Sequence, residues 1–302
     1  MKLPAMYFAE NERRPNWAKD PAVVHFNNRY YLYYTIAPSE ERPGLGIGIA
    51  ESQDLVNWHY IREMEIKTDV HPHGFGAPAA LVREGKIYLF YQSYGTGVKD
   101  AICLAVSENG LDFTIDPGSP IFHPPVSSWS CGRAIDADIV FYKGKYFLYA
   151  ATRDPENKVQ KIVAAVSEGG FSAESWKLAY EGIILAPELP WEMTCIEAPA
   201  TLVHNEKIYM FYAGAYNNCP QQIGCAVSTD GVTFRRISNE PILPAGAPGE
   251  WNSSESGHPY AFTDDDGSQY LFYQGNNDNG KTWYLSVKKI LWDGDMPILE
   301  EM

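Results

Sequence analysis

Three carboxylates stand at or directly beside corresponding points of three sequence repeats. Asp20 precedes Pro21, Asp136 precedes Ala137, and Glu197 comes directly before Ala198 and Pro199. Carboxyl groups give and take protons, and charged side chains are seldom buried unless they are paired or used in chemistry. Three carboxylates that meet at one place therefore indicate a functional site.

A structural interpretation of the same residues also exists. A single Asp-Pro step at the start of a strand is most often a turn or a cap, because aspartate favours turns. Asp138 shares the strand face of Asp136, so either of them could be the inward carboxylate. The functional interpretation rests on the three carboxylates taken together.

Further polar and aromatic residues lie just before the same points of the repeats, including His71, Trp251 and Glu255. Aromatic faces with carboxylates among them suit a sugar, whose C–H faces stack while its hydroxyls form hydrogen bonds. His258 also fits a histidine that is merely satisfied inside the fold. The residues that we predict to contact a substrate are Trp17, His73, Phe75, Trp129, Arg133, Trp191 and His258.

Five repeats supply the elements that must position these residues. In each repeat a short apolar segment, a polar turn and an aromatic segment such as 30–34 or 208–212 precede a segment of small residues that ends near a serine. These serines are 55 to 61 residues apart, at Ser52, Ser107, Ser167, Ser228 and Ser286. Such a period, with three or four strands per unit, predicts an all-β, five-bladed propeller of four-stranded antiparallel blades around a central channel.

Aligning the aromatic segments places one position at the start of each innermost strand. This position is followed by proline in four of the five repeats, and proline is tolerated at a strand's first residue. The first strand of each blade lines the channel, so the five positions should converge at one mouth. They are Asp20, Ala77, Asp136, Ala198 and His258.

Composition fits one domain over residues 1–302. The chain is 45% hydrophobic, yet no apolar run approaches the ~20 residues of a membrane span. Its net charge of −14 argues against nucleic acid and anionic membranes as partners, because both attract basic patches. Turn residues such as Asn27-Asn28 and Lys143-Gly144 stand where the first hairpins must reverse. The oligomeric state is left open.

Cysteines and acidic clusters give little sign of a metal. The five cysteines form no zinc-type pairs, and Cys103 and Cys225 are expected to be buried thiols. The 264–266 aspartates lack the ligand spacing of a calcium loop, which favours a solvated hairpin tip. The N-terminus has no apolar signal region, which predicts a cytoplasmic protein, although a secreted protein that has lost its signal peptide gives the same sequence.

At these residues the chain resembles the family 43 glycoside hydrolases and, more distantly, other five-bladed propeller glycosidases of families 32, 62 and 117. Lys19-Asp20-Pro21 is similar to the family's general-base motif and Ile135-Asp136-Ala137 to its second aspartate motif, with alanine where proline is common. Glu197-Ala198-Pro199 is similar to the general-acid motif, with alanine for glycine. The resemblance covers nearly the whole chain.

The resemblance implies roles for these residues. Asp20 would be the catalytic base, Glu197 the acid, and Asp136 the residue that orients the acid and raises its pKa. It also implies an inverting reaction on an α-L-arabinofuranoside or β-D-xyloside, and a funnel closed at its base suggests attack on a chain end. No cofactor is required, although a structural calcium ion near His258 would be consistent with the family.

Two alternatives compete with this interpretation. A retaining β-fructosidase of the family 32 type uses three acidic residues on the same fold, but its motifs differ from those here, and Cys195 precedes Glu197 instead of following it. A non-catalytic carbohydrate-binding propeller would keep the aromatic residues without needing three carboxylates in register.

Overall fold

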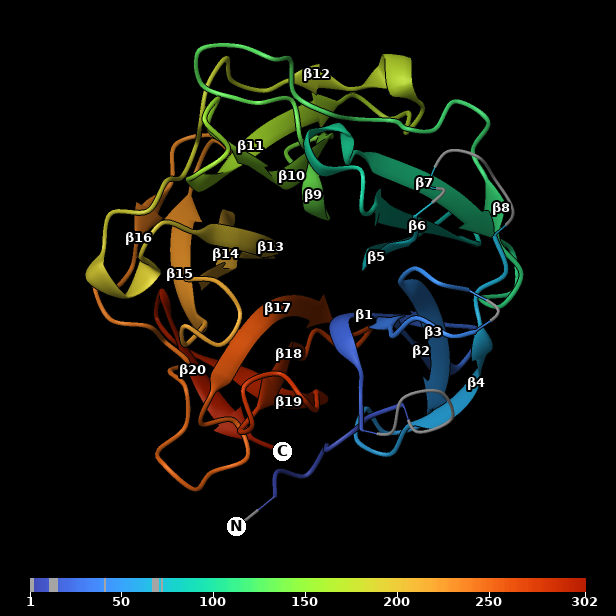
Figure 1. Ribbon diagram of the computed structural model, residues 1–302, viewed down its shortest axis with the longest axis vertical. Coiled ribbons are helices and arrows are strands. Elements are labelled where there is room, and N and C mark those ends of the chain that lie inside the picture. The colour runs from blue at the N-terminus through green and yellow to red at the C-terminus, as the bar shows by residue number, and fades with distance from the viewer. Residues whose placement is uncertain (1–2, 11–15, 41, 67–70, 72) are drawn as a thin grey trace.

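Five four-stranded antiparallel sheets surround a common centre in the computed structural model of the protein, which confirms the predicted propeller (Figure 1). The structure describes residues 3–10, 16–40, 42–66, 71 and 73–302. In each blade the strands follow chain order from the centre outward. β1, β5, β9, β13 and β17 therefore line the channel.

The strands of each blade, from the innermost to the outermost, are as follows: blade one, β1 (Lys19–Phe26), β2 (Arg29–Ile36), β3 (Gly46–Ser52) and β4 (His59–Glu63); blade two, β5 (Phe75–Arg83), β6 (Lys86–Ser93), β7 (Ile102–Ser107) and β8 (Thr114–Ile115); blade three, β9 (Ile135–Tyr142), β10 (Lys145–Arg153), β11 (Gln160–Ser167) and β12 (Lys177–Leu178); blade four, β13 (Ile196–His204), β14 (Lys207–Gly214), β15 (Gln222–Ser228) and β16 (Arg235–Arg236); blade five, β17 (Glu255–Thr263), β18 (Gln269–Asn276), β19 (Tyr284–Asp293) and β20 (Met296–Glu301). Three short 3-10 turns accompany them: η1 (Gly97–Lys99), η2 (Ala173–Ser175) and η3 (Pro190–Glu192).

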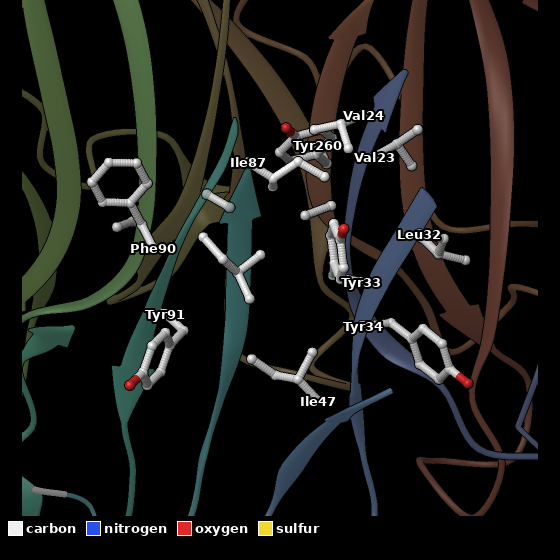
Figure 2. Close-up of a cluster of buried hydrophobic side chains, with 14 of the residues drawn as sticks. Val23, Val24, Leu32, Tyr33, Tyr34, Ile47, Ile87, Phe90, Tyr91 and Tyr260 are labelled. Atoms are coloured by element: carbon white, nitrogen blue, oxygen red, sulfur yellow. The ribbon is translucent and has the colours of Figure 1, made fainter. Parts of the chain in front are cut away.

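Aromatic side chains of the second strands fill the space between blades. Tyr33, Phe90 and Tyr91 are fully buried, and Figure 2 shows them in the apolar core. Tyr33 packs against Phe113 of blade two, and Phe90 packs against Phe171 and Trp176 of blade three. Some hydroxyl groups also join neighbouring blades: Tyr33 donates to the carbonyl of Gly110, 2.9 Å away, and Tyr149 to that of Gly231, 2.8 Å away. A buried tyrosine thus supplies a large apolar surface and one satisfied polar contact.

The first hairpins turn where the sequence places them. Asn27 and Asn28 have φ of 53° and 60°, and Lys143 and Gly144 have φ of 47° and 80°. Positive φ at both central residues is the geometry of the tight turns that match the twist of two antiparallel strands. The predicted hairpin positions are therefore confirmed.

The five aligned corner positions are structurally equivalent, as predicted. Each lies in the left-handed region, with φ between 41° and 51°, although none is a glycine: Asp20, Ala77, Asp136, Ala198 and His258. The pairing of the first two strands also shifts at each of these points. The corner is thus a bulge inside the innermost strand, and not its first residue, because pairing resumes on both sides of it.

The N-terminal segment closes the ring. Phe8 pairs with Leu285 of β19, and Trp17 pairs with Trp283 just before that strand. The amide of Ala18 also donates to the carbonyl of Trp283 at 3.0 Å. Blade five is therefore tied to the residues that lead directly into β1.

Candidate active site

A pocket of about 210 Å³ lies at the mouth where the five corners converge. All three predicted carboxylates line it, and each comes from a different blade. Its lining is polar and charged on most sides. The residues are Lys19, Asp20, Leu45, Gly76, Ala77, Gln92, Tyr94, Arg133, Ile135, Asp136, Arg153, Gln160, Glu197, Tyr216, Asn217 and His258.

Asp20 is held as an ionised carboxylate. Its Oδ1 lies 3.1 Å from Nδ1 of His258. Burial acts to raise the pKa of Asp20, but the nearby charges of His258 and Lys19, with a hydrogen bond from Thr35, outweigh burial and lower it. A lowered pKa keeps Asp20 ionised at neutral pH, and the ionised form is the one that can accept a proton.

Asp136 has the opposite environment. Burial is the largest cause of its shift, and together with the negative charges of Glu197 and Asp20 it raises the pKa of Asp136 to about 7. His258 and Arg133 act in the other direction. The expected repulsion between the negative charges of Asp136 and Glu197 is therefore present, and it helps to raise the pKa of Asp136.

Glu197 is gripped by two amides. Gln160 Nε2 donates to Oε2 of Glu197, and Gln221 Nε2 donates to Oε1 at 2.6 Å. Both glutamines are buried. Two donors on the two oxygens fix the plane of the carboxyl group, while each oxygen keeps a second site for a proton or a substrate hydrogen bond.

Gln160 is in turn oriented by two arginines. Its Oε1 accepts from Nε of Arg153 at 2.8 Å and from a guanidinium nitrogen of Arg133 at 3.4 Å. Because these donors occupy the carbonyl side, the NH₂ side must face Glu197. Arg133 is anchored by Asp100, 3.3 Å away, and Arg153 stacks against the ring of Tyr216.

Lys19 contributes a half-buried positive charge. Its Nζ donates to Oδ1 of Asn217 at 3.1 Å and lies 4.5 Å from the ring centre of Trp283. Burial disfavours the ammonium, but the carboxylates of Asp20 and Glu255 outweigh burial, so the pKa of Lys19 is raised. The lysine therefore stays charged beside the proposed base.

The structure separates the two aspartates of β9. Asp136 lines the pocket with Asp20 and Glu197, whereas Asp138 lines a second cavity farther along the channel. Asp138 accepts hydrogen bonds from the amide and hydroxyl of Thr201, and burial raises the pKa of Asp138 to about 7. The bulge lies at Asp136, and it is Asp136 that lines the pocket while Asp138 does not.

Of the residues predicted to contact a substrate, Arg133 and His258 line the pocket. The others lie outside its lining. Trp17 is buried against Trp283 and Ala37, so its indole ties the N-terminal segment to blade five. Trp191 stacks on Tyr212, with ring centres 6.0 Å apart, and donates to the carbonyl of Asn239.

Phe75, Trp129 and His73 also lie outside the lining. The ring of Phe75 is buried against His71 and Tyr91, Trp129 is half-buried on the edge of the main apolar core, and His73 is exposed. Contact between any of these residues and a bound sugar stays a prediction.

Sequence reasoning missed several pocket residues. Gln160, Arg153 and Tyr216 belong to later strands and loops of blades three and four, and nothing in the repeat pattern distinguishes them. The buried amide of Gln160, at the start of β11, has no composition signal. Lys19, adjacent to Asp20, is the exception, because its place in the Lys-Asp-Pro step follows from the register.

The described side chains that are grouped closely enough to bind a metal ion lie away from the pocket. Within the described residues, the one group of three candidate ligands is His25, Asp264 and Asp265, at hairpins away from the pocket, where His25 Nδ1 lies 2.8 Å from Asp265. His258 is not part of it. The 264–266 aspartates are half-buried or exposed at the turn between β17 and β18, as expected of a solvated tip. In the same described part, no helix is long and apolar enough to cross a membrane.

A channel mouth that holds carboxylates from three blades offers the acidic groups that glycoside hydrolysis uses. The chain belongs to the glycosyl hydrolases family 43, whose family model matches residues 11–296. It is a glycosidase, and the predicted resemblance is confirmed.

Several solved structures share this fold. A thermostable family-43 glycoside hydrolase superposes with a TM-score of 0.78 at 21% identity, covering 98% of this chain and 96% of that one. An endo-1,4-β-xylanase from Bacteroides thetaiotaomicron gives 0.73 at 23% identity, covering 94% of each chain. The GH32 β-fructofuranosidase BmSUC1 of Bombyx mori gives 0.76 at 16% identity, and the match covers 99% of this chain but 65% of that one.

Proposed function

We propose that the protein is an inverting, exo-acting glycosidase that releases a terminal α-L-arabinofuranosyl or β-D-xylosyl residue. Asp20 is the general base, Glu197 the general acid, and Asp136 the residue that orients the acid and tunes its pKa. The observation that carries this proposal is the placement of these three carboxylates in one pocket, with Asp20 and Asp136 in opposite electrostatic environments.

The reaction follows from these environments. Asp20 takes a proton from a water molecule whose oxygen forms a bond to the anomeric carbon. The bond from that carbon to the leaving oxygen breaks, and Glu197 gives its proton to this oxygen. Glu197 ends as a carboxylate, with amide donors on both oxygens. Hydrogen bonds to the charged form stabilise it as the proton leaves.

The size of the pocket supports attack on a chain end. Its volume of about 210 Å³ lies below the ~300–1,000 Å³ of sites that enclose drug-sized ligands. Such a volume suits a single sugar ring better than several consecutive ones. A pentose as that sugar fits the family resemblance and the xylanase among the similar structures.

Membership of family 43 weighs against the two alternatives. The family 32 enzyme shares the fold at only 16% identity, so this likeness does not indicate that the present protein catalyses the same reaction. A purely carbohydrate-binding propeller has no use for an ionised Asp20 opposite an amide-bound Glu197.

The test is hydrolysis of aryl pentofuranosides, pentopyranosides, galactosides and fructosides by the wild type and by Asp20→Asn. We expect turnover of a pentoside, a loss of about 10²–10⁴-fold in the variant, and unchanged folding. Proton NMR of the first product should show the anomer opposite to that of the substrate. Retention of configuration, or turnover of fructosides alone, would contradict the proposal.

A further inference from the structure

The left-handed corners share a pattern of backbone hydrogen bonding. At four of the five corners the backbone N–H is donated to a side-chain oxygen. Asp20 donates to Oε1 of Gln274 at 3.0 Å, and Asp136 donates to Oε1 of Gln92 at 2.8 Å. Ala77 donates to Oγ1 of Thr35 at 2.8 Å, and His258 to Oε1 of Gln221 at 3.1 Å. These bonds satisfy amides that the bulge removes from the strand ladder.

Three of the four acceptors occupy equivalent positions in their blades. Thr35, Gln92 and Gln274 occupy the same register in the second strands of blades one, two and five, opposite Lys19, Gly76 and Gly257 respectively. Each caps the corner of the following blade, so blade five caps blade one. Blades three and four carry Ala151 and Ala213 at this register, and the loop residue Gln221 replaces the missing cap for His258.

The two corners that carry an aspartate are the two capped from this register by a glutamine. Both amides are buried, and Gln274 is fully enclosed. The other end of Gln274 is also fixed, because its Nε2 donates to Oε1 of Glu255 at 2.7 Å. Glu255 in turn accepts a hydrogen bond from the backbone N–H of Asn218 at 2.8 Å. The cap of Asp20 is therefore part of a rigid buried network.

We propose that Gln274 and Gln92 are positioning residues, which hold the backbone of Asp20 and Asp136 in the left-handed corner and so aim their carboxylates into the pocket. An amide does this without adding a charge that would change either aspartate. This inference rests on the proposed function, in which Asp20 is the base and Asp136 assists the acid.

The cap matters because the corner is strained. A non-glycine residue in the left-handed region places Cβ close to the carbonyl oxygen, so it persists only where its surroundings hold it. Without the acceptor, residue 20 can relax toward extended φ, which swings its Cβ and moves the carboxylate away from His258. Misplacing a catalytic group by 1 Å lowers the rate about 100-fold.

The experiment compares Gln274→Met and Gln92→Met with Gln269→Met. Methionine keeps the unbranched length but lacks the amide. Gln269 is a matched control, because it is a buried glutamine of the same strand β18 that bonds the carbonyl of Val203 and lies outside the pocket. We expect kcat on the preferred aryl glycoside to fall about 100-fold in the first two variants with KM changed less than about threefold. The control should lose thermal stability but keep its kcat.

A pH profile separates positioning from mere structural damage. In Gln274→Met the carboxylate moves from His258, so the acid limb of kcat/KM should move to higher pH, while the profile of Gln269→Met stays unchanged. Losses of kcat no larger than that of the control would overturn the proposal. Should Gln274→Met not fold, Gln92→Met decides the matter, because its side chain makes a single hydrogen bond to the corner.

Crystal structures of the variants distinguish failure of this inference from failure of the proposed function. If the wild type cleaves no glycoside, φ at residues 20 and 136 still reports the cap. Residues that stay left-handed in the methionine variants would overturn the inference, and residues that relax would support it whatever the reaction proves to be.

Discussion

His258 Nδ1 lies 3.1 Å from Oδ1 of Asp20, although 238 residues separate the two in the chain. This contact joins the first and fifth blades at the pocket, and it is one of the causes that keep the pKa of Asp20 low. A residue of the last blade therefore helps to lower the pKa of the proposed base in the first blade.

Replacing this histidine should move the pH profile. In His258→Gln the pKa of Asp20 rises, so the acid limb of kcat/KM shifts to higher pH. For each unit by which the pKa of Asp20 rises, kcat/KM at a given pH on that limb falls about tenfold, and the plateau stays unaffected. His204→Gln, at a half-buried histidine stacked on Trp292 away from the pocket, is the control. A profile that moves to lower pH, or not at all, contradicts the role of His258.

Glu197→Gln should make the rate depend on the leaving group. An aryl oxygen with a low pKa departs without protonation, whereas an alcohol of a natural sugar needs a proton. We expect a loss of about 10²–10⁴-fold on oligosaccharides and a much smaller loss on nitrophenyl glycosides. Asp20→Asn should lower both rates alike. Equal losses in Glu197→Gln would remove the acid role.

The buried Asp138 should make stability depend on pH. Its pKa is about 7 in the folded protein, well above that of an unfolded aspartate. The folded state thus binds a proton more tightly than the unfolded state, and the stabilisation is complete below about pH 4 and is lost as pH rises through 7. Asp138→Asn removes this term, so the variant should gain up to about 4 kcal/mol relative to wild type between pH 4 and 8.

Urea titrations of both proteins at several pH values measure this difference. Because the substitution lies outside the pocket, substrate cleavage at pH 6 provides the check that the fold is intact. A difference in unfolding free energy that does not change with pH would show that Asp138 is not protonated in the folded protein.

Removing divalent metals should leave the activity intact. The proposed base, acid and tuning group are all protein carboxylates, and Asp20 already has an imidazole and an ammonium nearby. Dialysis against EDTA should therefore leave kcat and KM unchanged. Loss of activity that calcium restores would place a cation in the pocket, with His258 as the first residue to substitute.

The sequence alone predicts the ring and the register, because both depend on local patterns repeated five times. Aromatic second strands fix where each innermost strand runs, and the X-Pro step marks the corner. Asp20 and Asp136 have the same φ, which shows that the aligned sequence positions are equivalent in the structure. The alignment could not choose between Asp136 and Asp138, since the bulge that separates their roles changes the backbone and leaves no mark in the periodicity.

The pocket's other walls were much less predictable. Sequence favours aromatic residues near the corners as sugar platforms, but Trp17 and Trp191 pack on neighbouring elements instead. An apolar ring gains more by covering adjacent core than by facing water, and only the three-dimensional arrangement decides which surface is available. Gln160 and Gln221 escaped notice because an amide is chemically ordinary until it is buried beside a carboxylate.

The pairing of Phe8 with Leu285 and of Trp17 with Trp283 also has a consequence for synthesis of the protein. Blades two to four can form in order as the chain leaves the ribosome, because each needs only residues already made. Asp20 emerges early, whereas His258, Gln274 and Trp283, the partner of Trp17, are all made only with blade five. The nascent polypeptide therefore cannot complete the pocket around Asp20 before blade five has been synthesised.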